Sequence, residues 1–310
     1  MNKPKNILDL TVDEKKEFLK SFDMVLSDCD GVLWHGKTPI ENSGKGINLL
    51  QAANKRIGYI SNNSGRSDQE YEEMFRACDI NFDLNNLCHT VKNITSYLKH
   101  NKFEGKIYAI GSKSLHEELK SAGFEVIEEP NYAEEESFIG FLQYISVKEK
   151  VSAVILHGYW NVSATNLVRA QVYLSENPEC LFITGASDMF LKFRDKNILG
   201  PGMFTKMLAD CTNQKPIVLS KPGIDLCDIV LKKFNINDPK RVVMIGDMLD
   251  QDIAFGKICK FQTLAVLTGG ATLEDFDKAE HRKVLPDFYA NSLGDFIQFF
   301  DELDCENVEK

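Results

Sequence analysis

Short, nearly unbroken apolar runs alternate along the chain with stretches in which apolar residues recur at helical spacing. Unbroken runs of this length are typical of parallel strands that are buried on both faces. Such runs cover residues 24–28, 57–62, 216–221, 241–247 and 263–267. Helical spacing is found at residues 11–22, 43–53 and 224–234. The alternation predicts an α/β fold whose core is a doubly wound, Rossmann-like parallel sheet.

The spacing of these runs predicts a domain inserted into the core. Ser61 and Lys221 lie 160 residues apart, far more than one strand and one helix require. The stretch between them has its own predicted strands and helices, at residues 106–111, 114–123, 151–156, 166–176 and 180–185. We therefore expect a core made of residues 1–91 and 214–310, with a second α/β domain at residues 92–213.

Composition and charge exclude several classes of protein. With 310 residues, of which 43% are hydrophobic, the chain can bury a large core. Its net charge of −10 argues against a nucleic acid or an anionic membrane as partner. Eight scattered cysteines without a C-x-x-C pair predict reduced thiols rather than a zinc site or a disulfide framework. A polar start and the lack of a long apolar run lead us to expect a cytoplasmic protein.

Four of the predicted core strands end in a charged or hydroxyl side chain that could take part in catalysis or binding. These residues are Asp28, Ser61, Lys221 and Asp247. Because the carboxyl ends of parallel strands line one crevice, we expect the four side chains to meet there. Their neighbours in the sequence would enlarge the site with further acids and amides, namely Asp30, Asn62, Asn63, Ser64, Asp250 and Asp252.

Such a site would suit phosphate chemistry with a divalent cation. Several carboxylates without histidine or thiolate form an oxygen-only site, which Mg²⁺ prefers. A hydroxyl, loop amides and a lysine suit the oxygens of a phosphate group. Asp28 could attack phosphorus and form an aspartyl-phosphate, while Asp30, two residues on and on the same side of an extended chain, could protonate the leaving group. That role requires anionic neighbours to raise the pKa of Asp30.

Four motifs in this order resemble those of the haloacid dehalogenase-like (HAD) hydrolase superfamily. They are "DCDGV" (28–32), "SNNS" (61–64), "SKPG" (220–223) and "GDMLDQD" (246–252). With the large insert between the second and third motifs, the chain is similar to the group of nitrophenylphosphatases, phosphoglycolate phosphatases and pyridoxal phosphate phosphatases. Residues 265–276 also resemble the end of that group, so the resemblance covers nearly the whole chain.

The resemblance implies an Mg²⁺-dependent phosphatase that hydrolyses a small-molecule phosphomonoester through an aspartyl-phosphate. It implies that Asp28 is the nucleophile and a metal ligand, that Asp30 is the general acid and base and a ligand through its backbone carbonyl, and that Asp247 is the third ligand. The remaining implied roles are phosphate binding by Ser61, Asn62, Asn63 and Lys221, and support behind the metal ligands by Asp252. Asp250 corresponds to a position that is often acidic without binding the metal.

In this family the insert is a C2-type cap that closes over the substrate, and a homodimer formed through the cap is compatible with the resemblance. Two stretches of the insert depart from the family pattern. They are "TGASDMF" (184–190), where an Asn-rich turn leading to an aspartate is expected, and "HGYWNVSATNL" (157–167). These departures leave the identity of the substrate open.

Other interpretations also fit the same residues. Asp28 and Asp30 could end a solvated loop, Ser61 could start an ordinary polar turn, and Lys221 could be a surface lysine. Asp250 could be a charge at a helix N-terminus. A phospho-accepting signalling domain is shorter and carries its acid pair before the acceptor, and a dehalogenase needs neither Asp30 nor a metal. A noncatalytic phosphate-binding relative is the remaining alternative, although no catalytic position is missing.

Overall fold

The computed structural model describes residues 3–127, 137–146, 149–158, 160–193, 196–282 and 284–308. The chain divides into two compact units. Unit 1 comprises residues 1–61, 66–88 and 230–310, and unit 2 comprises residues 62–65 and 89–229. Residues 214–229, which the sequence spacing assigned to the core, therefore lie in unit 2.

Unit 1 is built on a seven-stranded sheet in the order β1-β16-β15-β14-β2-β5-β6. The strands are β1 (Lys5–Asn6), β16 (Phe288–Ala290), β15 (Gln262–Val266), β14 (Val242–Gly246), β2 (Met24–Ser27), β5 (Arg56–Ser61) and β6 (Leu87–His89). From β1 to β5 every neighbouring pair is parallel. Every residue of β2 and β14 is buried, which confirms the strand prediction from unbroken apolar runs.

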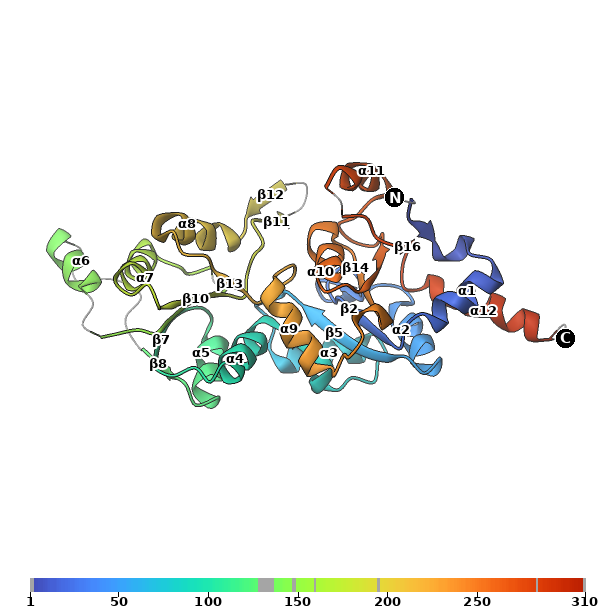
Figure 1. The fold of residues 1–310 in the computed structure, drawn as a ribbon, viewed down its shortest axis with the longest axis horizontal. Helices are drawn as coiled ribbons and strands as arrows, with labels where there is room; N and C mark the ends of the chain where they lie inside the picture. Colours follow the sequence, from blue (N-terminus) through green and yellow to red (C-terminus); the bar gives the residue numbers. More distant parts are fainter. Residues whose placement is uncertain are drawn as a thin grey trace. The chain divides into compact units, whose positions relative to one another are not determined.

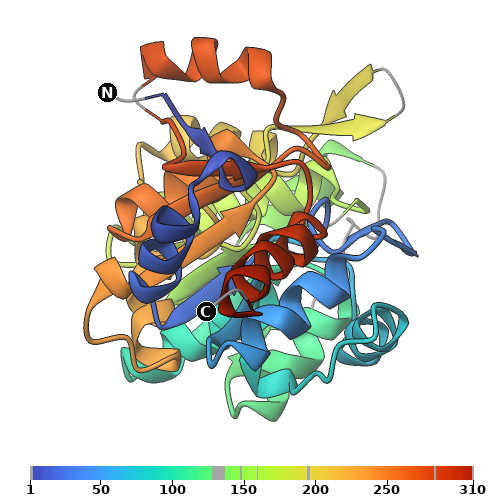
Figure 2. The ribbon, with the colours of Figure 1, turned by 90° about the vertical axis from the view of Figure 1, so that its right-hand side faces the viewer.

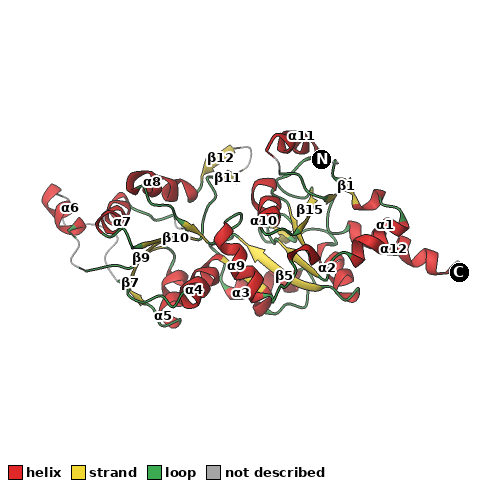
Figure 3. Ribbon diagram, viewed as in Figure 1, coloured by secondary structure: helices red, strands yellow, loops and turns green. Residues whose placement is uncertain are grey.

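Helices cover both faces of this sheet, which confirms the doubly wound α/β class (Figures 1 and 3). On one face Val25 and Ile245 share a hydrophobic cluster with Phe18, Ile47 and Phe299. These three residues belong to α1 (Val12–Lys20), α2 (Ser43–Ala52) and α12 (Asp295–Val308). Figure 2 shows α12 beside α2, in line with the contacts between α12 and both α1 and α2.

A second cluster covers the other face, where Ala265 of β15 packs with Ile253 and Phe276. Phe276 belongs to α11 (Leu273–Arg282). The remaining elements of this unit are η1 (Ile7–Asp9), the hairpin β3 (Trp34–His35) and β4 (Thr38–Pro39), α3 (Asp68–Ala77), η2 (Leu84–Asn86), η3 (Pro239–Arg241), η4 (Leu249–Ile253) and α10 (Ala254–Ile258). Helix α9 (Ile224–Lys233) crosses the boundary between the units.

Unit 2 is a smaller α/β layer structure. Its five-stranded sheet has the order β13-β10-β9-β7-β8, and all neighbouring pairs are parallel. The elements are β7 (Lys106–Ile110), β8 (Glu125–Val126), β9 (Ala153–Leu156), β10 (Leu181–Thr184), β13 (Ile217–Val218), α4 (Thr90–His100), α5 (Lys113–Ser121), α6 (Phe138–Ile145), α7 (Ala164–Glu176), α8 (Gly202–Thr212) and the hairpin β11 (Phe190–Phe193) and β12 (Lys196–Leu199). Helices α4 and α5 share one apolar cluster with the sheet, and α7 and α8 share the other.

The prediction that residues 216–221 form a strand of the core sheet is wrong. Only Ile217 and Val218 are in a strand, and this strand pairs with β10 in the sheet of unit 2. Lys221 therefore does not end a strand of the seven-stranded sheet. An apolar run shows that a strand is buried, but it does not show which of two sheets the strand joins.

The prediction of reduced thiols is confirmed for five cysteines and wrong for two. Cys29, Cys78, Cys88, Cys180 and Cys211 are free. Cys227 and Cys259 are disulfide-bonded, which their spacing in the sequence did not indicate. Among the helices of the described ranges, none has both the length and the apolar character that a membrane crossing requires.

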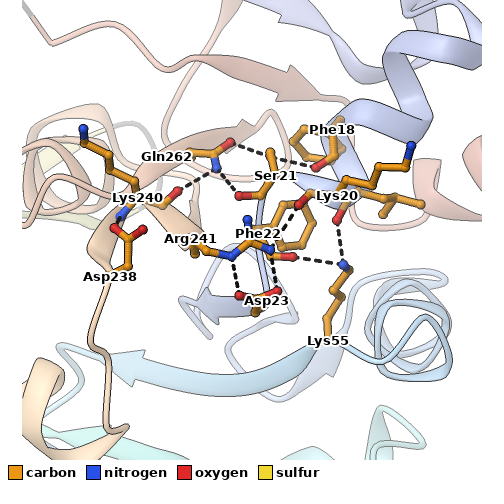
Figure 4. A network of polar contacts seen from close by, with 11 residues as sticks. Phe18, Lys20, Ser21, Phe22, Asp23, Lys55, Asp238, Lys240, Arg241 and Gln262 are labelled. Atoms are coloured by element: carbon orange, nitrogen blue, oxygen red, sulfur yellow. Dashed lines mark hydrogen bonds and ion pairs between the residues drawn. The ribbon is translucent and has the colours of Figure 1, made fainter.

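A polar network fastens the amino ends of four neighbouring strands in unit 1 (Figure 4). The Lys55 ammonium, just before β5, donates to the carbonyl oxygens of Leu19 and Phe22 at 2.6 and 2.9 Å. The Arg241 guanidinium, just before β14, donates to the carboxylate of Asp23, just before β2. Gln262, which begins β15, donates to the carbonyl oxygens of Ser21 and Lys240.

Gln262 also accepts a hydrogen bond from the Ser21 hydroxyl at 3.0 Å. The half-buried amide of Gln262 thus bonds to three polar groups, which belong to Ser21 and Lys240. Removal of the amide leaves these groups without this partner. We predict that Gln262→Ala lowers the free energy of unfolding by about 1–3 kcal/mol. In the matched variant Gln69→Ala, an exposed residue with one bond to Glu73 is lost, and we expect a change within about 0.5 kcal/mol. Urea unfolding of both variants tests this, and equal losses would contradict the structural role of the network.

Candidate active site

Three buried carboxylates meet at the carboxyl ends of β2 and β14 in unit 1. Asp28 follows β2, and its N–H donates to the carbonyl oxygen of Ile245 at 2.9 Å, so it continues the strand pairing. Asp247 follows β14, and Asp252 lies in the π-helical turn η4. One carboxylate oxygen from each of the three acids lies within 4.8 Å of the others. The side chains of all three are less than a tenth exposed.

Backbone donors and glycines shape this cluster. The N–H of Gly270 donates to Asp247 Oδ2 at 2.7 Å, and the N–H of Met248 donates to Asp252 Oδ2 at 2.9 Å. An added Cβ at Gly31 or Gly269 would overlap the Asp247 carboxylate. Only glycine at these two positions allows the backbone to lie this close to the acid. Gly31 also has a φ of +83°, a conformation that side-chain-bearing residues rarely adopt.

This donor set fits a hard divalent cation. Three carboxylates buried within 4.8 Å of one another repel each other strongly, and a bound cation offsets both this repulsion and their desolvation. Their oxygen-only chemistry suits Mg²⁺ or a similar ion. Asp252, which we placed behind the ligands, contributes to this cluster. Asp250 is exposed and lies outside it.

Asp30 is placed beside the cluster by the turn that follows β2, but its carboxylate has other partners. The indole N–H of Trp34 donates to Asp30 Oδ1 at 3.1 Å, and the Arg66 guanidinium donates to Asp30 Oδ2 at 2.8 Å. The Asp30 side chain remains 37% exposed, whereas Trp34 is fully buried. The Asp30 carboxylate is therefore more accessible than those of Asp28, Asp247 and Asp252.

Ser61 ends β5 and is buried, with 1% of its surface exposed. The hydroxyl of Tyr71 donates to Ser61 Oγ at 2.9 Å. Burial raises the pKa of Tyr71 well above its ordinary value, so the phenol stays protonated and keeps this bond. This bond from Tyr71 fixes the Ser61 oxygen in position.

Residues 62–65, directly after Ser61, belong to unit 2, and so does Lys221. The Asn62 side chain donates to the carbonyl oxygen of Lys221 at 2.9 Å and accepts from the Lys221 N–H at 2.8 Å. Ser187 also donates to the Lys221 carbonyl oxygen, at 3.1 Å. The Lys221 side chain is 1% exposed. The second and third sequence motifs are thus joined by a pair of hydrogen bonds.

A pocket of about 340 Å³ lies within unit 2. The loop Asn62–Gly65 forms one of its walls, and Asn63 braces this loop by accepting from the Gly65 N–H at 3.0 Å. The lining also includes Trp160, which is 61% exposed, and Asp188 of the "TGASDMF" stretch. The pocket therefore begins one residue after Ser61 along the chain.

Comparison with known proteins decides the family. A model of haloacid dehalogenase-like hydrolases matches residues 25–125, and a second model of HAD-like hydrolases matches residues 218–296. Phosphoglycolate phosphatase 2 of Arabidopsis thaliana is 31% identical over 290 residues, which are 92% of this chain and 96% of the relative. The chain belongs to the haloacid dehalogenase-like hydrolases.

Two further comparisons extend over most of this HAD-like hydrolase. Glycerol-3-phosphate phosphatase of Rattus norvegicus is 29% identical, with coverage of 93% of this chain and 94% of the relative. The solved structure of p-nitrophenyl phosphatase from Archaeoglobus fulgidus has a TM-score of 0.76 and 25% identity, and covers 90% of this chain and 99% of that chain. The resemblance predicted from four short motifs is confirmed.

Several residues of the HAD-like site were missed in the sequence. Arg66 and Tyr71 contact Asp30 and Ser61, yet an arginine in a polar loop and a tyrosine in an amphipathic helix have no distinguishing pattern. The glycines of "TGG" (268–270) reach Asp247 from a distant part of the chain. A Gly-Gly pair that starts two residues after the predicted strand at 263–267 was the available signal for them.

We predict that Gly269→Ala abolishes divalent cation binding, because the added methyl group displaces the Asp247 carboxylate. Thermal unfolding with and without a saturating concentration of Mg²⁺ measures the effect, because a ligand that binds only the native state stabilises it. The wild type should gain stability with Mg²⁺, and the variant should not. As a control, Gly123→Ala meets open space at a positive φ, so it should lower stability but keep the response to Mg²⁺. An undiminished Mg²⁺ response of Gly269→Ala would contradict the proposed cation site.

Proposed function

We propose that this protein, a phosphoric monoester hydrolase of the HAD-like family, is an Mg²⁺-dependent phosphatase that acts on small phosphate esters through an aspartyl-phosphate. The observation that carries the proposal is the buried cluster of Asp28, Asp247 and Asp252 at the strand ends. Asp28, Asp247 and the backbone carbonyl of Asp30 would hold the cation, with Asp252 adjoining them. The bound cation would neutralise the negative charge that accumulates on the carboxylates and the phosphoryl oxygens.

The reaction would proceed in two steps. Asp28 attacks phosphorus, the bond from phosphorus to the ester oxygen breaks, and Asp30 donates a proton to that oxygen. A water molecule then attacks the phosphorus of the aspartyl-phosphate while Asp30 accepts its proton. The bond from phosphorus to the Asp28 oxygen breaks, inorganic phosphate leaves, Asp28 returns as a carboxylate, and Asp30 returns as the protonated acid.

Ser61, Asn62, Asn63 and Lys221 would bind the phosphate oxygens. The hydroxyl of Ser61 is oriented by Tyr71, and Asn62 follows Ser61 directly. Lys221 is buried, and the Asn62 side chain bonds to both its backbone N–H and its carbonyl oxygen. A buried ammonium with a fixed backbone is suited to pair with a phosphate group.

We further propose that the inserted domain is the cap of this enzyme. It was predicted at residues 92–213, and these residues belong to unit 2. Its pocket beside Asn62 would receive the leaving group. The relatives are named for phosphoglycolate, glycerol 3-phosphate and nitrophenyl phosphate, and we propose substrates from these classes or pyridoxal 5′-phosphate. A cytoplasmic location and a homodimer formed through the cap complete the proposal.

The first test is metal dependence. Hydrolysis of nitrophenyl phosphate should stop in EDTA and return with added Mg²⁺, because the three buried acids repel both each other and the substrate without a cation. Ca²⁺ should inhibit, since its larger and more variable coordination shell does not preserve the attack geometry. Undiminished hydrolysis in EDTA would contradict the proposal.

The second test concerns the pocket. Asp188 places a carboxylate at its wall, so Asp188→Asn should favour a leaving group that carries its own negative charge. We expect kcat/KM for phosphoglycolate to rise about 5- to 100-fold relative to glycerol 3-phosphate. The control Glu176→Gln removes an exposed charge at the end of α7 and should leave the ratio unchanged. An equal effect of Asp188→Asn on both esters would show that the pocket does not hold the leaving group.

A further inference from the structure

Arg66 lies outside the four motifs, yet its side chain is only 13% exposed. It stands two residues after "SNNS", just before the N-cap of α3, in unit 1. One terminal nitrogen of the guanidinium donates to Asp30 Oδ2 at 2.8 Å, and the other terminal nitrogen donates to the carbonyl oxygen of Gly36 at 2.6 Å. A surface arginine would keep its rotational freedom, whereas this one is fixed at both nitrogens.

Aromatic rings hold the guanidinium from the side. Its central carbon lies 5.4 Å from the ring centroid of Trp34 and 5.9 Å from that of Tyr71. Both rings are fully buried. Both residues also bond to predicted site residues, because Trp34 donates to Asp30 and Tyr71 donates to Ser61. The Arg66 guanidinium thus contacts Trp34, which bonds to Asp30, and Tyr71, which bonds to Ser61.

The consequence for Asp30 is a carboxylate held at both oxygens. Trp34 bonds Oδ1 and Arg66 bonds Oδ2, while the side chain stays 37% exposed. Loss of Arg66 would remove the donor to Oδ2 and would weaken the constraint on the orientation of the Asp30 side chain. A proton donor that must meet a leaving oxygen at hydrogen-bond distance loses efficiency when its orientation is not fixed.

We propose that Arg66 is a positioning residue for Asp30, holding its carboxyl group in the orientation for proton transfer to the leaving group. This inference rests on the proposed function. Arg66 contacts neither the phosphate nor the leaving group in this role, and acts through Asp30 alone. Its bond to Gly36 ties the β3–β4 hairpin to the same guanidinium.

The test compares two esters that differ in their need for a proton. In Arg66→Met, which removes the hydrogen bonds but keeps a long side chain over Trp34, kcat for glycerol 3-phosphate should fall about 10- to 100-fold. For nitrophenyl phosphate, whose leaving group scarcely needs protonation, the loss should stay below about 3-fold. KM should change little for either ester. Arg66→Lys, which restores one charged donor, should recover part of the alkyl-ester rate.

A double-mutant cycle identifies the path of the effect. If Arg66 acts through Asp30, Arg66→Met should cost less than about 3-fold when added to Asp30→Asn, although it costs far more in the wild type. Arg76→Met is the matched control, since Arg76 is exposed in the last turn of α3. It should leave the rates with both esters unchanged. Urea unfolding of each variant monitors stability separately.

The outcomes distinguish this inference from the proposed function. Absence of Mg²⁺-dependent nitrophenyl phosphate hydrolysis in the wild type would overturn the proposed function. If the wild type is active, equal losses with both esters in Arg66→Met would overturn the positioning role. A full additional loss in the Asp30→Asn background would overturn it as well. A selective loss with the alkyl ester that disappears in that background is the expected result.

Discussion

Mutual repulsion among three buried carboxylates is the constraint on which the rest of unit 1 depends. Asp28, Asp247 and Asp252 bring oxygens within 4.8 Å of one another in a region almost closed to solvent. Isolated ionised carboxylates are costly to bury, and like charges at this distance add to the cost. The arrangement persists because each acid follows a strand or a turn that is fixed by its own backbone bonds. A bound cation would turn this unfavourable arrangement into a binding site.

The amino ends and the carboxyl ends of the strands in the seven-stranded sheet have different roles. At the amino ends, Lys55, Arg241 and Gln262 bond to carbonyl and carboxylate groups and fasten neighbouring strands to one another (Figure 4). At the carboxyl ends, the same strands deliver Asp28, Ser61 and Asp247. A network that contributes stability at the amino ends of the strands thus supports a buried, charged group of residues at their carboxyl ends.

How much of the structure could be predicted depended on whether a feature is local. β2, β5 and β14 were predictable because strands buried on both faces have unbroken apolar sequences. The strand before Lys221 was assigned to the wrong sheet, because partner choice depends on contacts with β10 that are distant in sequence. The bond from Arg66 to Asp30 and the approach of Gly269 to Asp247 are also distant contacts, and the residue types alone do not indicate them.

The central claim is that Asp28 becomes phosphorylated during turnover, and rapid quenching tests it most directly. The enzyme is mixed with an excess of ³²P-labelled ester and Mg²⁺, stopped in acid within milliseconds, and digested for peptide mapping. The account predicts label on the peptide that contains Asp28 and none in the Asp28→Asn variant. Turnover without a labelled protein, or label on a peptide that lacks Asp28, would contradict it.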